Sequence, residues 1–226
     1  METLERIRLE PVLELEPGRY STTERKSPEK YGDEAPEEWE KYWRESLSDS
    51  GLGHLANLRP GSWQVPVRLL LEEAPLEKIM SVELRPYEDQ GESLSVEWDP
   101  VLKGGIALLA GERPVIQAQC CGDLGNHVYW AAAARHTDAC WTRYWIGHPQ
   151  LPVRFADGWL ELGKPNDDRT PEALWRVWPE SLLQSVAGAR AELERFVPRI
   201  RQVLGKWPVK GDIHGLALNL AGLRAE

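Results

Sequence analysis

Reactive residue types gather in one central stretch of the sequence, which begins with "QCCGDLGNHVYW" at Gln119. Cysteine, histidine and aspartate side chains bind zinc, and a cysteine thiolate is also a strong nucleophile. The spacing of these residues along the chain decides which chemistry they favour. The candidates are Cys120, Cys121, Asp123, His127, His136, Cys140 and His148.

The spacing of these ligand types argues against a zinc site. Structural zinc sites place paired ligands about two to four residues apart, whereas Cys120 and Cys121 are adjacent. Adjacent side chains on a strand point to opposite faces, so the two thiols cannot easily share one ion. His136 and Cys140 have helical spacing, but a strand-like run begins near Cys140. We therefore expect no metal and no cofactor, and we expect the cysteines to pack as small buried hydrophobes.

Cys121 is the candidate nucleophile. It comes at the end of an expected strand, just before a loop and the start of a helix, where helix amides can lower the pKa of a thiol. It would need a base, and His148 or His127 would serve if the fold brought one close. The local signatures of known cysteine hydrolases are absent. Catalysis at Cys121 with His148 is therefore an alternative, and we do not expect the protein to be an enzyme.

The same segment also has a purely structural explanation. Gly122 and Gly125 allow a tight turn, and Asp123 can accept hydrogen bonds from loop amides. Asn126 would act as the N-cap of a short helix over "HVYWAAAAR". In this interpretation Asp123, Trp130 and Trp145 remain candidates for contacting a ligand or partner.

The elements that position these residues follow from the hydrophobic pattern. Alternation over residues 4–16 predicts a strand with one wet face, interrupted at Pro11. Residues 104–120 predict two strands around a glycine turn. "VRFADGWLELG" predicts a hairpin that turns at Asp157-Gly158, and "EALWRVW" predicts a further strand. "VRLLLEE" and "KIMSVELRPYE" fit a strand or a helix equally well.

Two amphipathic helices are predicted. One begins at Pro36, with Trp39, Trp43 and Leu47 on one face. The other begins at Pro179 and is ended or kinked by Pro198. Hairpins and helices without regular alternation predict an α+β fold, with a mainly antiparallel sheet and a long C-terminal helix. We expect a single domain over 1–226, with a possible N-terminal lobe over 1–60.

Composition narrows the class of protein. The formal net charge of −9 argues against nucleic acid as a partner, because counterion displacement needs lysine and arginine. No window of about 18 apolar residues and no signal-peptide core occur, so we expect a cytoplasmic protein that does not span a membrane. The chain has 11 Trp but only 2 Phe. Tryptophan is frequent both in cores and at binding surfaces.

The run from Cys120 to Leu162, with "CCGDLGN" and the later "WIGHP", resembles a family of uncharacterised bacterial proteins. This resemblance implies no activity and no catalytic residue. A broader likeness, in size, acidity and α+β layout, is to the immunity and adaptor proteins encoded beside bacterial toxins.

These observations favour a non-catalytic binding protein of the immunity or adaptor type, which would contact a basic protein partner through an acidic, Trp-bearing surface. Two alternatives stay open. One is a Cys/His-dependent or metal-dependent enzyme centred on Cys121. The other is a small-ligand-binding domain whose tryptophans line a pocket. The sequence does not determine the oligomeric state.

Overall fold

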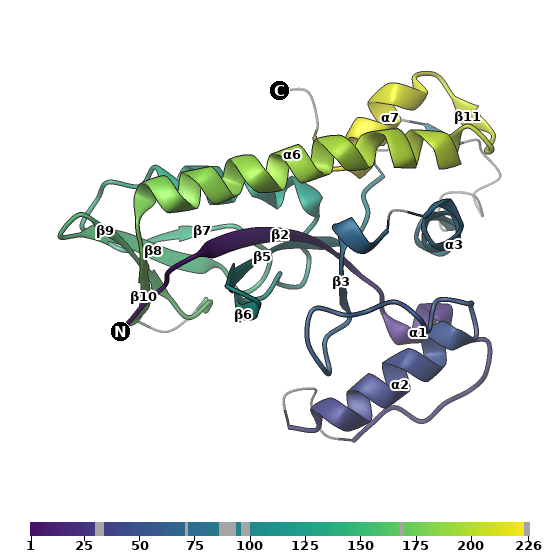
Figure 1. Cartoon of the computed structure of the whole chain (residues 1–226), viewed down its shortest axis with the longest axis horizontal. Coiled ribbons are helices and arrows are strands. Elements are labelled where there is room, and N and C mark those ends of the chain that lie inside the picture. The colour runs from purple at the N-terminus through teal and green to yellow at the C-terminus, as the bar shows by residue number, and fades with distance from the viewer. Residues whose placement is uncertain (30–33, 71, 86–93, 96–99, 168–169, 224–226) are drawn as a thin grey trace. The chain divides into compact units, whose positions relative to one another are not determined.

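A computed structural model describes residues 1–29, 34–70, 72–85, 94–95, 100–167 and 170–223 (Figure 1). The chain divides into two compact units. Unit 1 comprises Met1–Val12 and Gly104–Arg195, and unit 2 comprises Leu13–Lys103 and Phe196–Glu226. Each unit therefore combines an early and a late segment of the chain.

Helices and strands alternate irregularly, and the predicted α+β class is confirmed. The helices are α1 (Pro17–Tyr20), α2 (Pro36–Ser48), η1 (Val67–Leu69), α3 (Glu73–Glu83), η3 (Leu124–Asn126), α5 (His127–Ala134), α6 (Pro179–Leu204) and α7 (Ile213–Leu220). The strands are β1 (Glu2–Thr3), β2 (Ile7–Glu14), β3 (Gln64–Pro66), β4 (Leu94–Ser95), β5 (Gly104–Ala110), β6 (Arg113–Ile116), β7 (Thr142–Tyr144), β8 (Leu151–Ala156), β9 (Trp159–Gly163), β10 (Ala173–Val177) and β11 (Val209–Lys210). No helix among the described residues is long and apolar enough to cross a membrane.

The main sheet lies in unit 1 and has the strand order β1-β10-β9-β8-β7. Its pairs are antiparallel except for β1 and β10, which run parallel. The predicted hairpin is present as β8 and β9. Asp157 and Gly158 both have positive φ angles, 51° and 83°, as a two-residue hairpin turn requires. This turn pairs Ala156 with Trp159 and so fixes the register of the hairpin.

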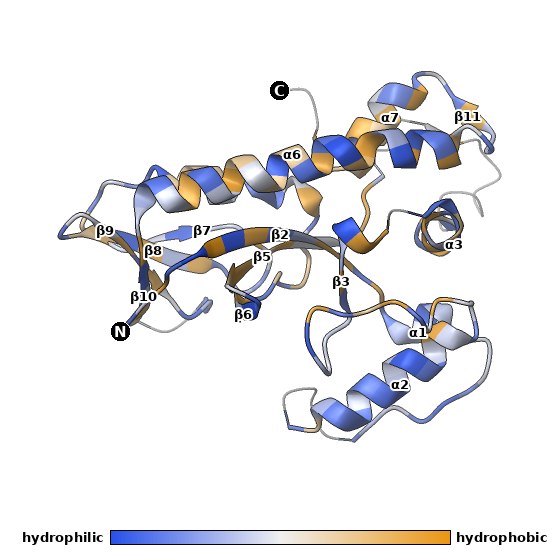
Figure 2. Ribbon diagram, viewed as in Figure 1, coloured by the Kyte–Doolittle hydropathy of each residue, from blue (hydrophilic) through white to orange (hydrophobic). Residues whose placement is uncertain are grey.

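The predicted C-terminal helix is present as α6, but it does not end at Pro198. The helix continues to Leu204, with Pro198 inside it. Hydrophobic and hydrophilic residues alternate along α6 (Figure 2), and the buried members of its apolar stripe include Leu182, Leu193 and Ile200. Burial of this stripe outweighs the backbone hydrogen bond that a proline removes.

The first long strand differs from its prediction. Strand β2 is buried on both faces rather than wet on one, because Glu10 and Val12 are as inaccessible as Leu9 and Leu13. Arg8 lies 3.0 Å from the Glu10 carboxylate, which is 0% exposed. The alternation pattern was misleading because it treats a charged residue as exposed, whereas here the buried Glu10 carboxylate is paired with a partly exposed arginine.

In unit 2, buried aromatic side chains donate hydrogen bonds to polar groups in the core. The Trp43 indole of α2 donates a hydrogen bond to the Leu15 carbonyl oxygen at 3.0 Å. The buried Tyr20 hydroxyl donates to Glu83 Oε1 at 2.8 Å, and Arg19 pairs with the same carboxylate. Burial, followed by the neighbouring Glu83 charge, raises the pKa of Tyr20. Of the two ambiguous segments, the first forms η1 over its first three residues, and the second lies in α3 as far as Glu83. Residue 71 and residues 86–88 of these segments lie outside the described residues.

We expect Tyr20→Phe to lower the free energy of unfolding by about 1–2 kcal/mol, because it leaves a buried carboxylate oxygen without its hydroxyl donor. Because the native Tyr20 pKa is raised, the wild type should also lose stability above about pH 10, where only the unfolded chain ionises this tyrosine. Tyr20→Phe should reduce that loss. Urea unfolding at pH 7 and pH 10.5 measures both effects.

Tyr42→Phe provides the control, because Tyr42 packs edge-on against Trp39 in α2 and has a half-buried ring. Its stability should change by less than about 0.5 kcal/mol. Equal destabilisation by the two substitutions would contradict the role given to the Tyr20–Glu83 hydrogen bond.

Candidate functional site

The two most distinctive sequence segments meet in unit 1. Cys120 and His148 form an isolated antiparallel bridge, in which the His148 amide donates to the Cys120 carbonyl oxygen at 2.8 Å. Gly147 makes this approach possible. A Cβ atom there would lie 2.7 Å from the Gln119 carbonyl oxygen, and its φ of 103° is one that side chains rarely adopt. "CCGDLGN" and "WIGHP" are therefore two halves of one backbone joint.

The bridge places Cys120, not the candidate nucleophile Cys121, opposite His148. The Cys120 thiol donates to the backbone carbonyl oxygen of His148 at 3.1 Å, and a carbonyl oxygen does not activate a thiol as a base would. The His148 imidazole lies edge-on to Trp145, with ring centroids 4.6 Å apart. Its Nδ1 lies 3.4 Å from Asp167 Oδ2. Asp167 has no motif around it, so sequence reasoning could not select it from 36 acidic residues.

The cysteines do not pack as buried hydrophobes. Cys120, Cys121 and Cys140 are all free and exposed. Cys121 has a φ of 61° and belongs to the turn itself. The expected strand up to Cys121 is also shorter than predicted, because β6 ends at Ile116. Cys121 therefore lies in the turn, Cys120 in the isolated bridge to His148, and Cys140 in a separate segment outside the helices and strands.

The structural roles predicted for the loop are only partly found. Asp123 accepts a hydrogen bond from the Gly125 amide at 2.7 Å and so caps η3, as expected. Asn126 was predicted as the N-cap of α5 but makes no side-chain capping hydrogen bond. It is the last residue of η3, has helical dihedral angles and is buried. Because η3 runs directly into α5, Asn126 is already part of a helical segment and does not act as an N-cap.

The other two candidate histidines, His127 and His136, make contacts that are typical of a structural role. His127 is buried, with Nδ1 3.3 Å from the Leu124 carbonyl oxygen, and burial lowers its pKa. His136 is also buried; its Nδ1 lies 3.0 Å from the Tyr144 hydroxyl and its Nε2 lies 3.3 Å from the Cys140 carbonyl oxygen. Within the described part of the chain, no three His, Cys, Asp or Glu side chains are placed to hold one metal ion.

The candidate tryptophans differ in accessibility. Trp130 is fully buried in α5, where it contributes to the core. Trp145 is half-buried beside His148. The most exposed large aromatic side chain among the described residues is Trp178, which is 48% exposed. This residue immediately precedes α6 and was not singled out by the sequence.

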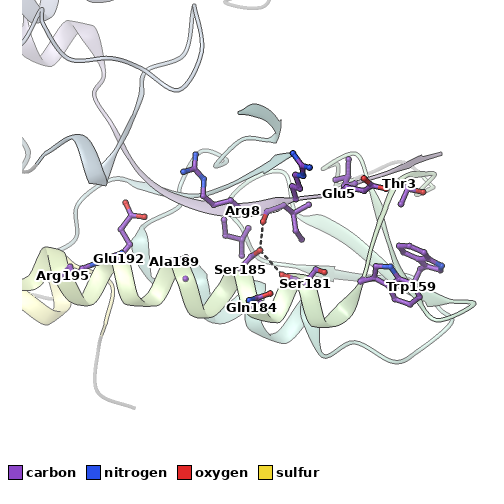
Figure 3. Close-up of a pocket in the computed structure, with 16 residues that line it drawn as sticks. Thr3, Glu5, Arg8, Trp159, Ser181, Gln184, Ser185, Ala189, Glu192 and Arg195 are labelled. Carbon is purple, nitrogen blue, oxygen red and sulfur yellow. Dashed lines mark hydrogen bonds between the residues drawn. The ribbon is translucent and has the colours of Figure 1, made fainter. Parts of the chain in front are cut away.

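Trp178 lies at a cleft of about 630 Å³ within unit 1. The cleft runs between residues 3–9 and one face of α6, from Ser181 to Arg195, with Trp159 and Trp178 also lining it (Figure 3). The Ser185 hydroxyl lies 3.1 Å from the Ile7 carbonyl oxygen and joins the helix to the strand. A volume of this size falls within the range of small-molecule sites.

The register of the main sheet builds an aromatic stack at this cleft. Val177 pairs with Leu160, so Trp178 and Trp159 are the next cross-strand neighbours. Their ring centroids lie 3.9 Å apart with an interplanar angle of 30°. The Arg176 guanidinium lies 4.7 Å from the Trp159 ring centroid. Arg176, Trp159 and Trp178 therefore form one stack, which we call the Trp178 stack.

A row of side chains across the sheet fixes Arg176 in position. Its Nε donates to Thr3 Oγ1 at 2.7 Å, and its cross-strand partner is Glu161. Glu161 is 8% exposed and accepts a hydrogen bond from Arg154 Nε at 2.7 Å. The Arg154 guanidinium in turn covers the Trp141 ring at 4.9 Å. Alternation in "WLELG" and "ALWRVW" assigns these residues to faces, but only the pairing of the strands brings them together.

Searches against family models, curated proteins and solved structures found no match to this chain.

We expect all three thiols to react with a disulfide reagent such as DTNB in the native protein, because all three cysteines are exposed. The number of thiols titrated before and after denaturation in guanidinium should be the same. Thiols that react only after denaturation would contradict the exposure described above.

Proposed function

We propose that this chain is a non-catalytic protein-binding protein of the adaptor or immunity type, and that the cleft at Trp178 is its contact surface. The observation that carries the proposal is the Trp178 stack. A large aromatic ring, 48% exposed, is held in one orientation by a second indole 3.9 Å away. Rigid, exposed tryptophans are the residues most often found at the energetic centre of protein interfaces.

Charged residues of both signs lie around the cleft at Trp178. Glu5, Asp157 and Glu180 are exposed, and none of them has an ion pair within the described ranges. Asp157 precedes Gly158, where a Cβ would lie 3.8 Å from the Trp178 ring. Glu180 follows Trp178 by two residues, and Glu5 lines the same cleft. Arg6, Arg8 and Arg195 also line the cleft and oppose these carboxylates. The support for a basic partner therefore comes from the formal net charge of the whole chain, −9.

Catalysis is less well supported by the geometry. The thiol nearest His148 in the bridge donates to a backbone carbonyl oxygen, whereas a nucleophile needs a base within hydrogen-bonding distance. Cys120 is therefore accessible without being arranged for an acyl-transfer or similar step.

The cleft itself favours a second candidate, a small-ligand-binding domain. Its volume of about 630 Å³ falls within the range of about 300–1,000 Å³ that ligand sites occupy. Two tryptophans at one end would report occupancy directly. A metabolite that shifts tryptophan fluorescence in the wild type, but not in Trp178→Ala, would support this candidate over protein binding.

Co-expression of the full chain with the reading frames that neighbour its gene in the host tests the main proposal. A protein retained at low salt would be purified and titrated by calorimetry. We expect Trp178→Ala to weaken its binding by about 2 kcal/mol, or roughly thirtyfold in Kd, because a hot-spot ring is removed.

Tyr129→Ala is the matched control, since Tyr129 is an exposed aromatic residue of the same unit, and its variant should bind as the wild type does. Retention of no protein partner would contradict the proposal. Equal binding by the wild type and Trp178→Ala would also contradict it.

A further inference from the structure

We propose that the adjacent thiols of Cys120 and Cys121 are a site of reversible oxidation, at which a low-molecular-weight disulfide converts them into a disulfide bond between neighbouring residues. The site belongs to the backbone joint between "CCGDLGN" and "WIGHP". It is independent of the binding function proposed above.

The backbone at Cys121 sets the direction of the two side chains. Cys120 takes part in an antiparallel bridge, which is a pairing of extended backbone. In an extended strand the next residue has a φ of about −120° to −140°, and its side chain points to the opposite face. Cys121 instead has a φ of 61°. This difference is a rotation of about 180° around the N–Cα bond, and it brings the Cys121 side chain to the side of the chain on which Cys120 lies.

The resulting separation suits a disulfide that is easily reduced. Consecutive Cα atoms lie about 3.8 Å apart across a trans peptide, and two Cβ atoms on the same side of the chain are separated by a similar distance. Disulfides span a Cβ–Cβ distance of about 3.5–4.5 Å, but their Cα atoms usually lie about 4.4–6.8 Å apart. A bond between Cys120 and Cys121 would therefore be strained, and strained disulfides are the labile, regulatory ones.

Hydrogen bonds on both sides hold this turn in place. The His148 amide donates to the Cys120 carbonyl oxygen at 2.8 Å, and the Gly104 amide donates to the Gly122 carbonyl oxygen at 3.2 Å. In an unfolded chain, a residue other than glycine has a positive φ only a few per cent of the time. The folded chain thus presents a thiol geometry that the unfolded chain adopts rarely, and folding should favour the disulfide.

Both thiols are accessible to a soluble oxidant, because Cys120 and Cys121 are exposed. The Cys120 thiol donates a hydrogen bond to the His148 carbonyl oxygen at 3.1 Å. A thiol is a weak donor, so the loss of this hydrogen bond on oxidation costs little, and the backbone bridge to His148 remains. Cys140 has no adjacent cysteine in the sequence and serves as the single-thiol comparison.

The reaction consists of two thiol–disulfide exchanges. The thiolate of one cysteine attacks a sulfur of glutathione disulfide, which forms a mixed disulfide and releases one glutathione. The thiolate of the other cysteine then attacks the protein sulfur of the mixed disulfide and releases the second glutathione. The protein loses two protons and two electrons, and one glutathione disulfide is reduced to two glutathione molecules.

The test equilibrates the reduced full-length variant Cys140→Ser with defined ratios of glutathione to glutathione disulfide. Remaining thiols are trapped with N-ethylmaleimide, and the intact mass is measured. We expect the main oxidised product to carry neither glutathione nor maleimide and to be about 2 Da lighter than the reduced chain. The equilibrium constant for its formation should be at least about tenfold larger in the folded protein than in guanidinium.

Single variants show which sulfurs form the bond. In Cys120→Ser and in Cys121→Ser, the remaining thiol of the pair should keep its glutathione, because no neighbouring thiol displaces it. Wild type should form the same internal disulfide as Cys140→Ser. Stable glutathione adducts on both adjacent cysteines would overturn the proposal. An internal disulfide that is lost in Cys140→Ser, or equal equilibrium constants in the folded and denatured chains, would also overturn it.

Discussion

The register between β9 and β10 is the constraint on which the candidate site depends. Pairing Val177 with Leu160 places Trp178 beside Trp159 and Arg176 beside Glu161. A shift of β10 by one residue would turn Arg176 and Trp178 to the face opposite Trp159 and Glu161, because side-chain direction alternates along a strand. The Asp157-Gly158 turn fixes the register of the neighbouring β8–β9 pair and so places Trp159 at the start of β9. The contact between Arg154 and the buried Glu161 carboxylate reinforces that β8–β9 register, since separating them would leave the carboxylate uncompensated.

The distinctive cysteine and histidine motifs have a different role from the one their residue types indicate. They form a backbone joint, in which the Cys120–His148 bridge closes against Gly147. Asp123 caps the turn that follows. Reactive side chains lie exposed around this joint because the backbone turns there, and the hydrogen bonds that define it run largely through backbone atoms. The aromatic cleft shares unit 1 with this joint but is built from different strands and from α6.

Tryptophan serves three purposes in this chain. Trp43 and Trp130 fill cores, and the Trp43 indole also donates to a backbone carbonyl. Trp141 and Trp159 form platforms for guanidinium groups within the main sheet. Trp178 is largely exposed and stacks on Trp159. The same side chain can do all three because it combines a large apolar area with a polar N–H and an electron-rich face.

The sequence by itself determined the α+β class, the β8–β9 hairpin and the helices beginning at Pro36 and Pro179. Each of these depends on local periodicity or on turn chemistry that a few neighbouring residues supply. The tertiary structure decided which tryptophans are exposed, that Glu10 is buried beside Arg8, and that Pro198 lies within a continuing helix. It also decided that Cys120, rather than Cys121, lies opposite His148, and that Asp167 lies near that histidine. These properties depend on which segments pair across long stretches of chain, and local patterns carry no information about such pairing.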